Sequence, residues 1–452
     1  MARNGGANPV IIAVVFYTAV VAACLSIVQS AALLHAARRA RREPPRRNGS
    51  VPVAVSVVIP CFNEQKVLRR TLDSVLASEG VELRRVICVD DGSTDGTAEI
   101  MLAARRDHAG KVIVLRQENK GKAAALNHGL TAVDTSVFVA VDADTQLTPH
   151  AIANLLARFA DDDVAAVSGQ MLVGNTSPRN RSVHLAQQRE YEFANNVDRR
   201  AFSRLGLVTV VPGAIGAFRS RAVLAAGGFP AGTLAEDAHL TFELLLRGHR
   251  VVHEPSAIVL TEAPDTLAGL IRQRIRWATG KLQVSARTAR QALRGHRKLR
   301  LLWGQTFLNQ GVLPLLTVFT PVGIAVVPAF AVLAAAQGAS PPAGVPVPAA
   351  VFAGTVLLTR LVHFVFATGF ARAADLTART ATGLPLTRPG PVSLVLIPVV
   401  ACAACWVAWF ALLTGRRRTW NKLDRTGDVR LGPPPAGGRD PAEPLRPAPL
   451  DA

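Results

Sequence analysis

The sequence predicts an α/β protein in which a mostly parallel sheet is attached to transmembrane and interfacial helices. Two observations support this fold class. In the middle of the chain, strand-like and helix-like segments alternate with short loops, which is typical of a largely parallel sheet. On both sides of this middle lie long stretches that are almost free of charge. The 452 residues are enough for a catalytic domain and a membrane part.

The first uncharged stretch, residues 9–37, contains no Asp, Glu, Lys or Arg and exceeds the roughly 20 apolar residues that a membrane span needs. Six arginines follow between Arg38 and Arg47, whereas only Arg3 precedes it. Because cytoplasmic flanks carry the excess of basic residues, we expect residues 1–40 to be a retained anchor. The domain that follows is then cytoplasmic. A cleaved signal peptide would carry its positive charge first.

Residues 50–265 have mixed composition and form the predicted soluble domain. The helix-like pattern after its first strand places Val67, Leu72 and Val75 on one side. We expect strands at 53–60, 84–91, 111–117 and 136–144, a turn and helix within 92–107, and helices at 64–78 and 122–133.

Two aspartates close the last of these strands, in the stretch VFVAVDADTQL. If the strand continues that far, Asp142 and Asp144 point to the same side. Two like charges so placed repel each other, so we expect a cation between them, and a divalent ion holding a phosphate is the obvious candidate. A solvated strand end is the alternative.

Polar clusters follow two neighbouring strands as well. Pro60, Asn63 and Glu64 come after the first strand, and Asp90 and Asp91 end the second. In a parallel sheet ligands bind at the carboxyl ends of the strands, so these clusters are expected at one rim together with the two aspartates.

Three further features lie downstream. The stretch VVPGAIGAFRS is rich in small residues, and Gly213 in it allows a ligand to approach the backbone closely. Glu236 and Asp237 begin a predicted helix that ends at Gly248, where acids also suit a simple cap. A later helix carries Gln273, Arg276 and Trp277 on one face. That face could lie at a membrane surface or grip a phosphate and stack on a sugar.

Residues 266–300 carry ten Lys or Arg and no acid, which suits amphipathic helices on an anionic membrane surface. We therefore expect the net charge of +19 to serve binding to anionic membrane lipids. Nucleic-acid binding is not expected, because the sequence shows no aromatic or groove-reading module. Residues 301–415 form the predicted transmembrane region, with uncharged stretches at 301–336, 345–371 and 391–415. The tail, 416–452, is basic and then rich in Pro and Gly, and we expect disorder from 428 onward.

Arg360 and His363 interrupt the span at 345–371. Charged groups at such positions usually face a protein interior or a wet path, so the lining of a channel and a structural pairing are both open. The side of the carboxyl terminus is open too. Three later spans would place Arg416 outside, and a re-entrant first segment would instead place Arg372 outside.

Taken together, these motifs resemble the inverting family 2 glycosyltransferases, in particular the membrane-embedded processive synthases of cellulose, chitin, hyaluronan and poly-N-acetylglucosamine. They read DDGSTDGT, DAD, AED and QRIRW within residues 52–300. The segments NKGKAAALNHGL, VVPGAIGAFRS and RTWNKLDRTG look most like the poly-β-1,6-N-acetylglucosamine synthase branch. Ala235 departs from the family, which usually has threonine there. The resemblance implies a GT-A fold, Rossmann-like with a mostly parallel sheet.

The resemblance also implies a role for each motif, with Mg²⁺ or Mn²⁺ as the cofactor. Asp237, beside Glu236, would take the proton from the acceptor hydroxyl. The nucleotide-sugar would contact Pro60, Asn63, Glu64, Asp90, Asp91, Lys122, Asp142 and Gly213; the metal would be held by Asp142 and Asp144; the donor diphosphate and the acceptor would be covered by Gln273, Arg276 and Trp277.

The function that the resemblance implies is transfer of a sugar, GlcNAc before others, from a UDP-sugar to a growing β-linked polysaccharide that is exported through the plasma membrane. Envelope or export proteins are expected partners. Two alternatives remain open. One is a single-addition transferase acting on a lipid or polyprenyl-phosphate acceptor, and the other is a catalytically silent membrane protein that binds nucleotide. Several spans after the catalytic motifs favour the polymerising enzyme, because its product needs a route out.

Overall fold

A computed structural model of the chain describes two long segments of the catalytic domain and one helix that follows it. The predicted anchor before residue 31, the predicted span at 345–371 with Arg360 and His363, and the tail beyond 429 lie almost wholly outside the described residues. The described residues are 49–175, 180–317 and 391–416, the short pieces 31–39 and 426–429, and residues 24, 28, 365, 368, 369, 371, 372 and 382.

Among the described residues, eight strands form one sheet in the order β3-β2-β1-β4-β7-β6-β8-β5. The pairings of β1 with β2 and β4, of β2 with β3, and of β6 with β8 are parallel. The first half of the sheet thus has the predicted βαβ order, which confirms the fold class. The strands are β1 (Ala54–Cys61), β2 (Glu82–Asp91), β3 (Val112–Gln117), β4 (Val137–Ala140), β5 (Gln146–Leu147), β6 (Val164–Val173), β7 (Gly216–Arg219) and β8 (Arg250–Thr261).

The second half of the sheet adds antiparallel strands that the sequence pattern did not predict. β7 runs antiparallel to both β4 and β6, and β5 runs antiparallel to β8. One expectation about the catalytic motif is wrong. β4 ends at Ala140, so Asp142 and Asp144 lie in the loop that follows and do not alternate along a strand. The loop, and not the pleat of the strand, therefore decides where these two carboxylates point.

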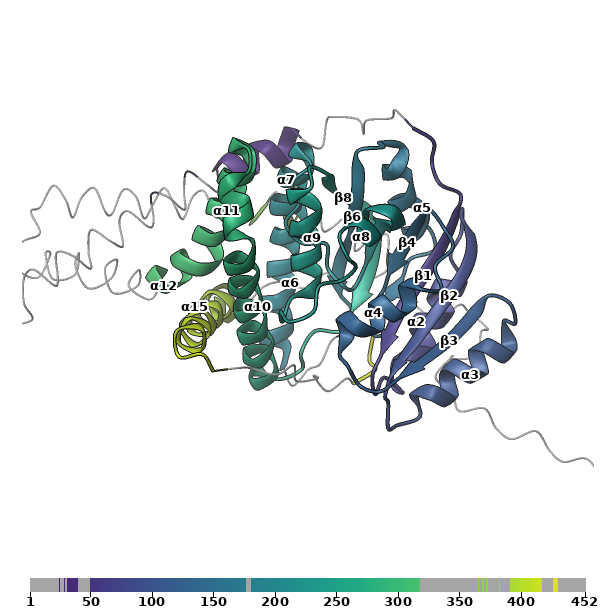
Figure 1. The fold of residues 1–452 in the computed structure, drawn as a ribbon. Coiled ribbons are helices and arrows are strands. Elements are labelled where there is room, and N and C mark those ends of the chain that lie inside the picture. Colours follow the sequence, from purple (N-terminus) through teal and green to yellow (C-terminus); the bar gives the residue numbers. More distant parts are fainter. Residues whose placement is uncertain are drawn as a thin grey trace, which may run out of the picture.

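Helices cover both faces of the sheet (Figure 1). Successive side chains of β1 point to opposite faces. Val57 and Ile59 pack with α2, α3 and α5, whereas Val58 packs with α4, α8 and α9. These helices are α2 (Leu68–Leu76), α3 (Thr97–Asp107), α4 (Lys122–Leu130), α5 (Ala151–Leu156), α8 (Ser220–Ala225) and α9 (Glu236–Leu246), and a 3₁₀ turn, η1 (Ala157–Ala160), follows α5.

A second group of helices stands beside the sheet, on the side of β6 and β8 (Figure 1). The long helix α10 packs against α9, α11 and α15, and α15 also packs against α6. The predicted interfacial segment 266–300 thus holds α10 and the start of α11. The group comprises α6 (Arg181–Phe193), the π-helical turn η3 (Ala194–Arg199), α7 (Arg200–Leu205), α10 (Leu267–Arg294), α11 (Arg297–Phe307), the π-helical turn η4 (Leu308–Val312), α12 (Leu313–Thr317) and α15 (Pro391–Leu413).

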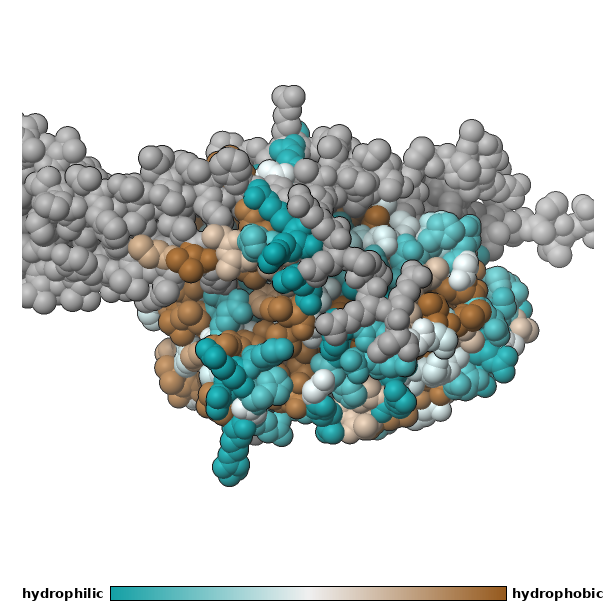
Figure 2. All heavy atoms as spheres, turned by 90° about the horizontal axis from the view of Figure 1, so that it is seen from above, coloured by the Kyte–Doolittle hydropathy of each residue, from teal (hydrophilic) through white to brown (hydrophobic). Residues whose placement is uncertain are grey.

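Within the described residues, α15 is the helix long and apolar enough to cross a membrane, over Leu396–Leu413. It coincides with the uncharged stretch predicted at 391–415. Its polar contacts run to η4, where Trp409 Nε1 donates to Gly311 O at 2.7 Å. Figure 2 shows hydrophobic residues gathered toward the end of the molecule where α11, α12 and α15 lie, whereas the opposite end is mixed with hydrophilic residues.

A short segment from the tail packs on the catalytic domain. Gln146 Nε2 donates to Val429 O at 2.7 Å, and Val429 is buried against Leu172 and Leu260. The side chain of Thr426 donates to Glu262 at 2.9 Å. Val429 belongs to the stretch predicted to be disordered, and in this structure its side chain is buried in a small apolar cluster.

Replacing Phe138 by Ala should lower the stability of the domain. Phe138 is fully buried on β4, stacks on Phe218 with ring centroids 5.4 Å apart and meets the edge of Phe229 at 6.5 Å. Losing this ring costs about 3–5 kcal/mol and lowers the unfolding midpoint by on the order of 10 °C. Thermal unfolding of the purified full-length protein in detergent measures it. The exposed Leu224→Ala serves as control, and equal midpoints for the two variants would contradict the expectation.

Candidate active site

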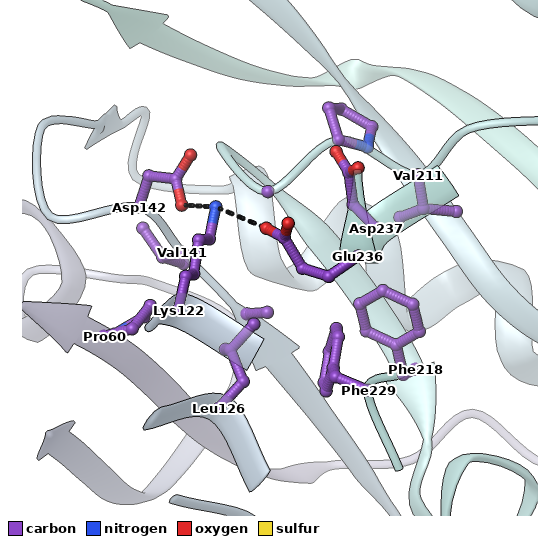
Figure 3. A pocket seen from close by; sticks show the side chains of 13 residues that line it. Pro60, Lys122, Leu126, Val141, Asp142, Val211, Phe218, Phe229, Glu236 and Asp237 are labelled. Carbon is purple, nitrogen blue, oxygen red and sulfur yellow. Dashed lines mark ion pairs between the residues drawn. The ribbon is translucent and has the colours of Figure 1, made fainter. Parts of the chain in front are cut away.

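A lysine ammonium lies between two carboxylates at the carboxyl end of the sheet (Figure 3). Lys122 Nζ contacts Asp142 Oδ1 and lies 3.6 Å from Glu236 Oε1. Lys122 is the first residue of α4, Asp142 follows β4, and Glu236 is the first residue of α9. Three elements far apart in the sequence therefore meet through one cation.

The position of Lys122 depends on a buried aspartate. Asp91 accepts hydrogen bonds from Gln117 Nε2 at 2.7 Å and from the N–H groups of Lys120 and Gly121 at 2.9 Å each. Gly121 has φ +88°, a conformation that residues with a side chain rarely adopt. These contacts fix the loop before α4, so Asp91 determines where the helix, and with it Lys122, begins.

The charges at the site shift each other's ionisation. Burial opposes the charged form of Lys122, but the charges of Asp142, Glu236 and Asp237 outweigh it and raise the Lys122 pKa. Burial raises the pKa of Asp237, and the charge of Glu236 raises it further, while Lys122 and Arg276 act in the opposite direction. A carboxylate with a raised pKa is a stronger base than an ordinary aspartate.

Glu236 and Asp237 open α9, where the sequence also allowed a plain cap. Asp237 Oδ1 accepts a hydrogen bond from Ala238 N at 2.7 Å, which is a local contact within the first turn. Both acids nevertheless line a cavity, so capping is not their whole role. Thr241 donates to Asp237 O and accepts from Val211 N at 3.0 Å, which ties α9 to the glycine-rich loop.

Gly213 lies in that loop, where the chain passes closest to the lysine. A Cβ at this position would overlap the ammonium of Lys122 and come within 3.0 Å of Asp142 Oδ1. A side chain there would push Lys122 away from Asp142. In this structure the groups closest to Gly213 are the protein's own Lys122 and Asp142, and the approach of a ligand there stays a prediction.

The lysine and the acids line one end of a cavity of about 230 Å³ between the sheet rim and α10. Ten of its lining residues bear charge when ionised, which is far more than an apolar ligand would require. Those ten are Lys122, Asp142, Asp144, Glu190, Arg199, Glu236, Asp237, Glu262, Arg276 and Lys281.

The predicted motif on α10 lines the same cavity. Gln273 is buried, and its Oε1 has no hydrogen-bond partner among the described residues. A buried unpaired amide oxygen is costly, so a ligand donor is expected there. α10 comes close to Asp237 because it passes the start of α9 at Gly280, where a Cβ would lie 2.7 Å from that of Ala235.

Not every predicted residue reaches the cavity. Pro60 lines a small pocket next to it, beneath Lys122. Asn63 accepts from Thr94 N at 2.8 Å with a φ of +54°, and Glu64 N donates to Thr97. Asp90 accepts from Ser93 N at 2.8 Å and pairs with Arg116 at 3.3 Å. Of the predicted nucleotide contacts, Asn63, Glu64, Asp90 and Asp91 thus connect the neighbouring loops in this structure.

Sequence reasoning missed the wall of the cavity opposite the sheet rim. It is formed by Glu190 and Tyr191 of α6, Arg199 of η3, Lys281 of α10 and Glu262. Burial lowers the pKa of Lys281. Glu262 directly follows β8, so the rule that found Asp142 could have found it. The residues of α6, η3 and α10 gave no such signal, because charged residues on an amphipathic helix are usually interpreted as its solvent-exposed face.

The donor set fits a divalent cation that is shared with a ligand. Asp142 and Asp144 both line the cavity, and no group of three or more His, Cys, Asp or Glu side chains able to hold a metal occurs among the described residues. Mg²⁺ is commonly bound by one or two carboxylates together with substrate phosphates and water. The two aspartates match that pattern. They are too few for a structural metal site, in which the protein supplies all the ligands.

Comparison with known proteins identifies the fold and motifs together. Residues 52–280 match the family model described as glycosyltransferase like family 2, which is half of the chain. The chain belongs to this family. The match covers β1 to β8, the acids of the rim and the Gln273 motif, and with them every residue that lines the cavity except Lys281.

Two curated relatives are similar to part of the chain. The poly-β-1,6-N-acetyl-D-glucosamine synthase of Staphylococcus aureus strain COL is 32% identical over 235 residues, 52% of this chain and 56% of the relative. That of Staphylococcus epidermidis is 30% identical over 235 residues, with the same coverage. The chain thus matches about half the length of these synthases. A mannosyltransferase structure from Pyrobaculum calidifontis shares the fold, with a TM-score of 0.59, 22% identity, and coverage of 91% of this chain and 100% of the other.

Replacing Gly213 by Ala should reduce glycosyltransferase activity about 10- to 100-fold, because the new methyl displaces Lys122 from Asp142. The unfolding midpoint should change little, since the displaced atom is the free end of a flexible side chain. The rate of nucleotide release from the nucleotide-sugar donor, measured with membranes, tests this. Gly304→Ala is the matched control, because nothing lies within 4 Å of a Cβ there. Full activity of Gly213→Ala would show that the pairing is dispensable.

Proposed function

We propose that the protein transfers N-acetylglucosamine from its UDP-sugar to the end of a β-linked polysaccharide, with inversion at the anomeric carbon, on the cytoplasmic side of the plasma membrane. One observation carries the proposal. A single cavity brings together the two aspartates after β4, the raised-pKa Asp237, and the motif of Gln273, Arg276 and Trp277. The similarity to poly-β-1,6-N-acetyl-D-glucosamine synthases supports the choice of sugar and product.

The donor would lie along the sheet rim with its diphosphate at Asp142. A Mg²⁺ or Mn²⁺ ion held by Asp142 and Asp144 would neutralise charge on the diphosphate as it leaves. Lys122 contacts Asp142 in the structure and is held charged by its neighbours, so it would stabilise the same negative charge. The nucleoside would extend toward Pro60 and the loops of Asn63 and Asp91, which are already ordered by hydrogen bonds to one another.

Asp237 would accept the proton of the acceptor hydroxyl. The hydroxyl oxygen forms a bond to the anomeric carbon, the bond from that carbon to the UDP oxygen breaks, and the proton passes to Asp237. Direct displacement inverts the anomeric centre, and no covalent sugar intermediate is formed. Glu236 assists indirectly, because its charge raises the pKa of Asp237 and thereby its strength as a base.

The acceptor would enter from the side of α10. Arg276 and Gln273 offer donors and acceptors for sugar hydroxyls, and the indole of Trp277 is a suitable platform for the apolar face of a sugar ring. Gln273 Oε1 is buried without a partner among the described residues, as expected of a group that a ligand satisfies.

The central experiment incubates membranes holding the full-length protein with radiolabelled UDP-GlcNAc and Mg²⁺ or Mn²⁺. We expect a polymer that is degraded by a β-1,6-specific hexosaminidase and not by chitinase. A labelled product of one sugar on an extractable lipid would instead support single addition to a lipid acceptor. Absence of transfer from UDP-GlcNAc, with transfer from another UDP-sugar, would reject the assigned donor.

The pH dependence of turnover should reveal the coupling between Glu236 and Asp237. Asp237 works as a base only when ionised, so turnover rises with pH through its pKa, and burial and Glu236 place that rise above the roughly 3.9 of an ordinary aspartate. In Glu236→Gln the charge that raises the Asp237 pKa is gone, so the acid limb should move to lower pH. Turnover measured from pH 4 to 8 tests this, and Asp237→Asn should lose activity at every pH. An unmoved limb in Glu236→Gln would contradict the coupling.

A further inference from the structure

A buried ion pair links α6 to the helix of the acceptor motif. Arg274, the residue after Gln273, is only 4% exposed. Its Nη1 donates to Glu190 Oε1 at 2.9 Å, and its Nη2 lies 2.5 Å from Glu190 Oε2. One hydrogen bond and one close ion-pair contact thus hold the guanidinium of Arg274 against the carboxylate of Glu190. Glu190 is on α6 and Arg274 on α10, so the pair spans two helices.

The same guanidinium lies over the indole of Trp277. Arg274 Cζ is 4.2 Å from the centroid of the Trp277 ring, within the range of a close cation–π contact. The indole also packs against the main hydrophobic core and lines the cavity. Because Glu190 holds the guanidinium of Arg274, the contact with that guanidinium also restricts the orientation of the Trp277 indole. Glu190, Arg274 and Trp277 therefore form one stack, defined here as the clamp.

Stability alone gives a weak reason for such a clamp. Burying a charge pair costs desolvation energy, and apolar residues of similar volume often stabilise a core as well or better. What the pair adds is geometry, since a guanidinium held at both nitrogens cannot rotate away from the ring. The indole of Trp277 can rotate about two side-chain torsions. It can receive the face of a sugar ring in a defined orientation only when these torsions are held.

The clamp is also braced by the apolar helix α15. Val400 of α15 packs with Val183 of α6 and Leu270 of α10 in one buried cluster. The two helices that contribute Glu190 and Arg274 are thus held together by the helix that is apolar enough to cross a membrane. The clamp therefore lies at the junction between the catalytic domain and that helix.

We propose that Glu190 and Arg274 are positioning residues for the acceptor, which act by holding the indole of Trp277 at the angle that receives the terminal sugar. The proposal rests on the proposed function, because it assigns the acceptor to Trp277. Glu190 and Arg274 need not touch the donor or the reacting atoms. Loss of the clamp should then weaken acceptor use and leave donor binding and activation intact.

Glu190→Gln and Arg274→Lys test this in the full-length protein in detergent. Each keeps most of the side-chain volume. Glu190→Gln removes the negative charge and Arg274→Lys removes the planar guanidinium, so neither variant can keep both contacts. We expect kcat/KM for a short β-linked GlcNAc oligosaccharide to fall about 10-fold, with the loss mainly in the acceptor KM. The slow hydrolysis of UDP-GlcNAc by water, which uses no acceptor, should stay within about twofold. Arg290→Lys, an exposed change on the same helix, is the control and should alter neither rate.

A second measurement does not depend on the acceptor. The chain has five tryptophans, so the contribution of Trp277 is the difference in acrylamide quenching between each protein and the same protein with Trp277→Phe. In the two clamp variants, the acrylamide quenching constant obtained for Trp277 should at least double. In Arg290→Lys this constant should be unchanged. An unchanged constant in both clamp variants would overturn the proposal, and so would an equal loss of hydrolysis and transfer. If the wild type transfers no sugar to the oligosaccharide, the proposed function fails, and quenching still decides whether the clamp orders Trp277.

Discussion

The ammonium of Lys122 is the interaction on which the site depends. Four carboxylates, those of Asp142, Asp144, Glu236 and Asp237, line one small region of the cavity, and like charges so close oppose folding. The lysine contacts the loop after β4 and lies 3.6 Å from the first residue of α9, so it offsets charge in both halves of the domain. The hydrogen bonds of Asp91 to the loop before α4 fix the position of this lysine.

The mixed sheet explains why these halves can meet. β7 inserts antiparallel between β4 and β6, and the glycine-rich loop that precedes it crosses the rim beside Lys122. Because β7 is antiparallel, it starts at the rim where β4 ends, so the loop with Gly213 lies beside Asp142. Glu236 at the start of α9 lies on the other side of Lys122, and α10 lines the same cavity.

The helices beside the sheet give the site its second wall and connect it to the apolar helix α15. α6 and α10 both line the cavity, and both pack against α15. Charged residues that would read as a solvated surface are enclosed here, because α15 and the sheet cover the outer faces of these helices. The contact of α15 with both helices includes the buried packing of Val400 on Val183 and Leu270.

The sequence by itself determined the fold class, the first βαβ half of the sheet, the start and end of α9, and the fact that acids follow the strands at one rim. Those features follow from local patterns, namely alternation in strands, periodicity in helices and polar residues after strands. It could not place Asp142 and Asp144, because β4 ends earlier than its apolar run suggests and a loop orients them. Nor could it find Glu190, Arg199 or Lys281. Their roles depend on which helices pack together, and only the tertiary structure, through contacts between residues far apart in the chain, decides that.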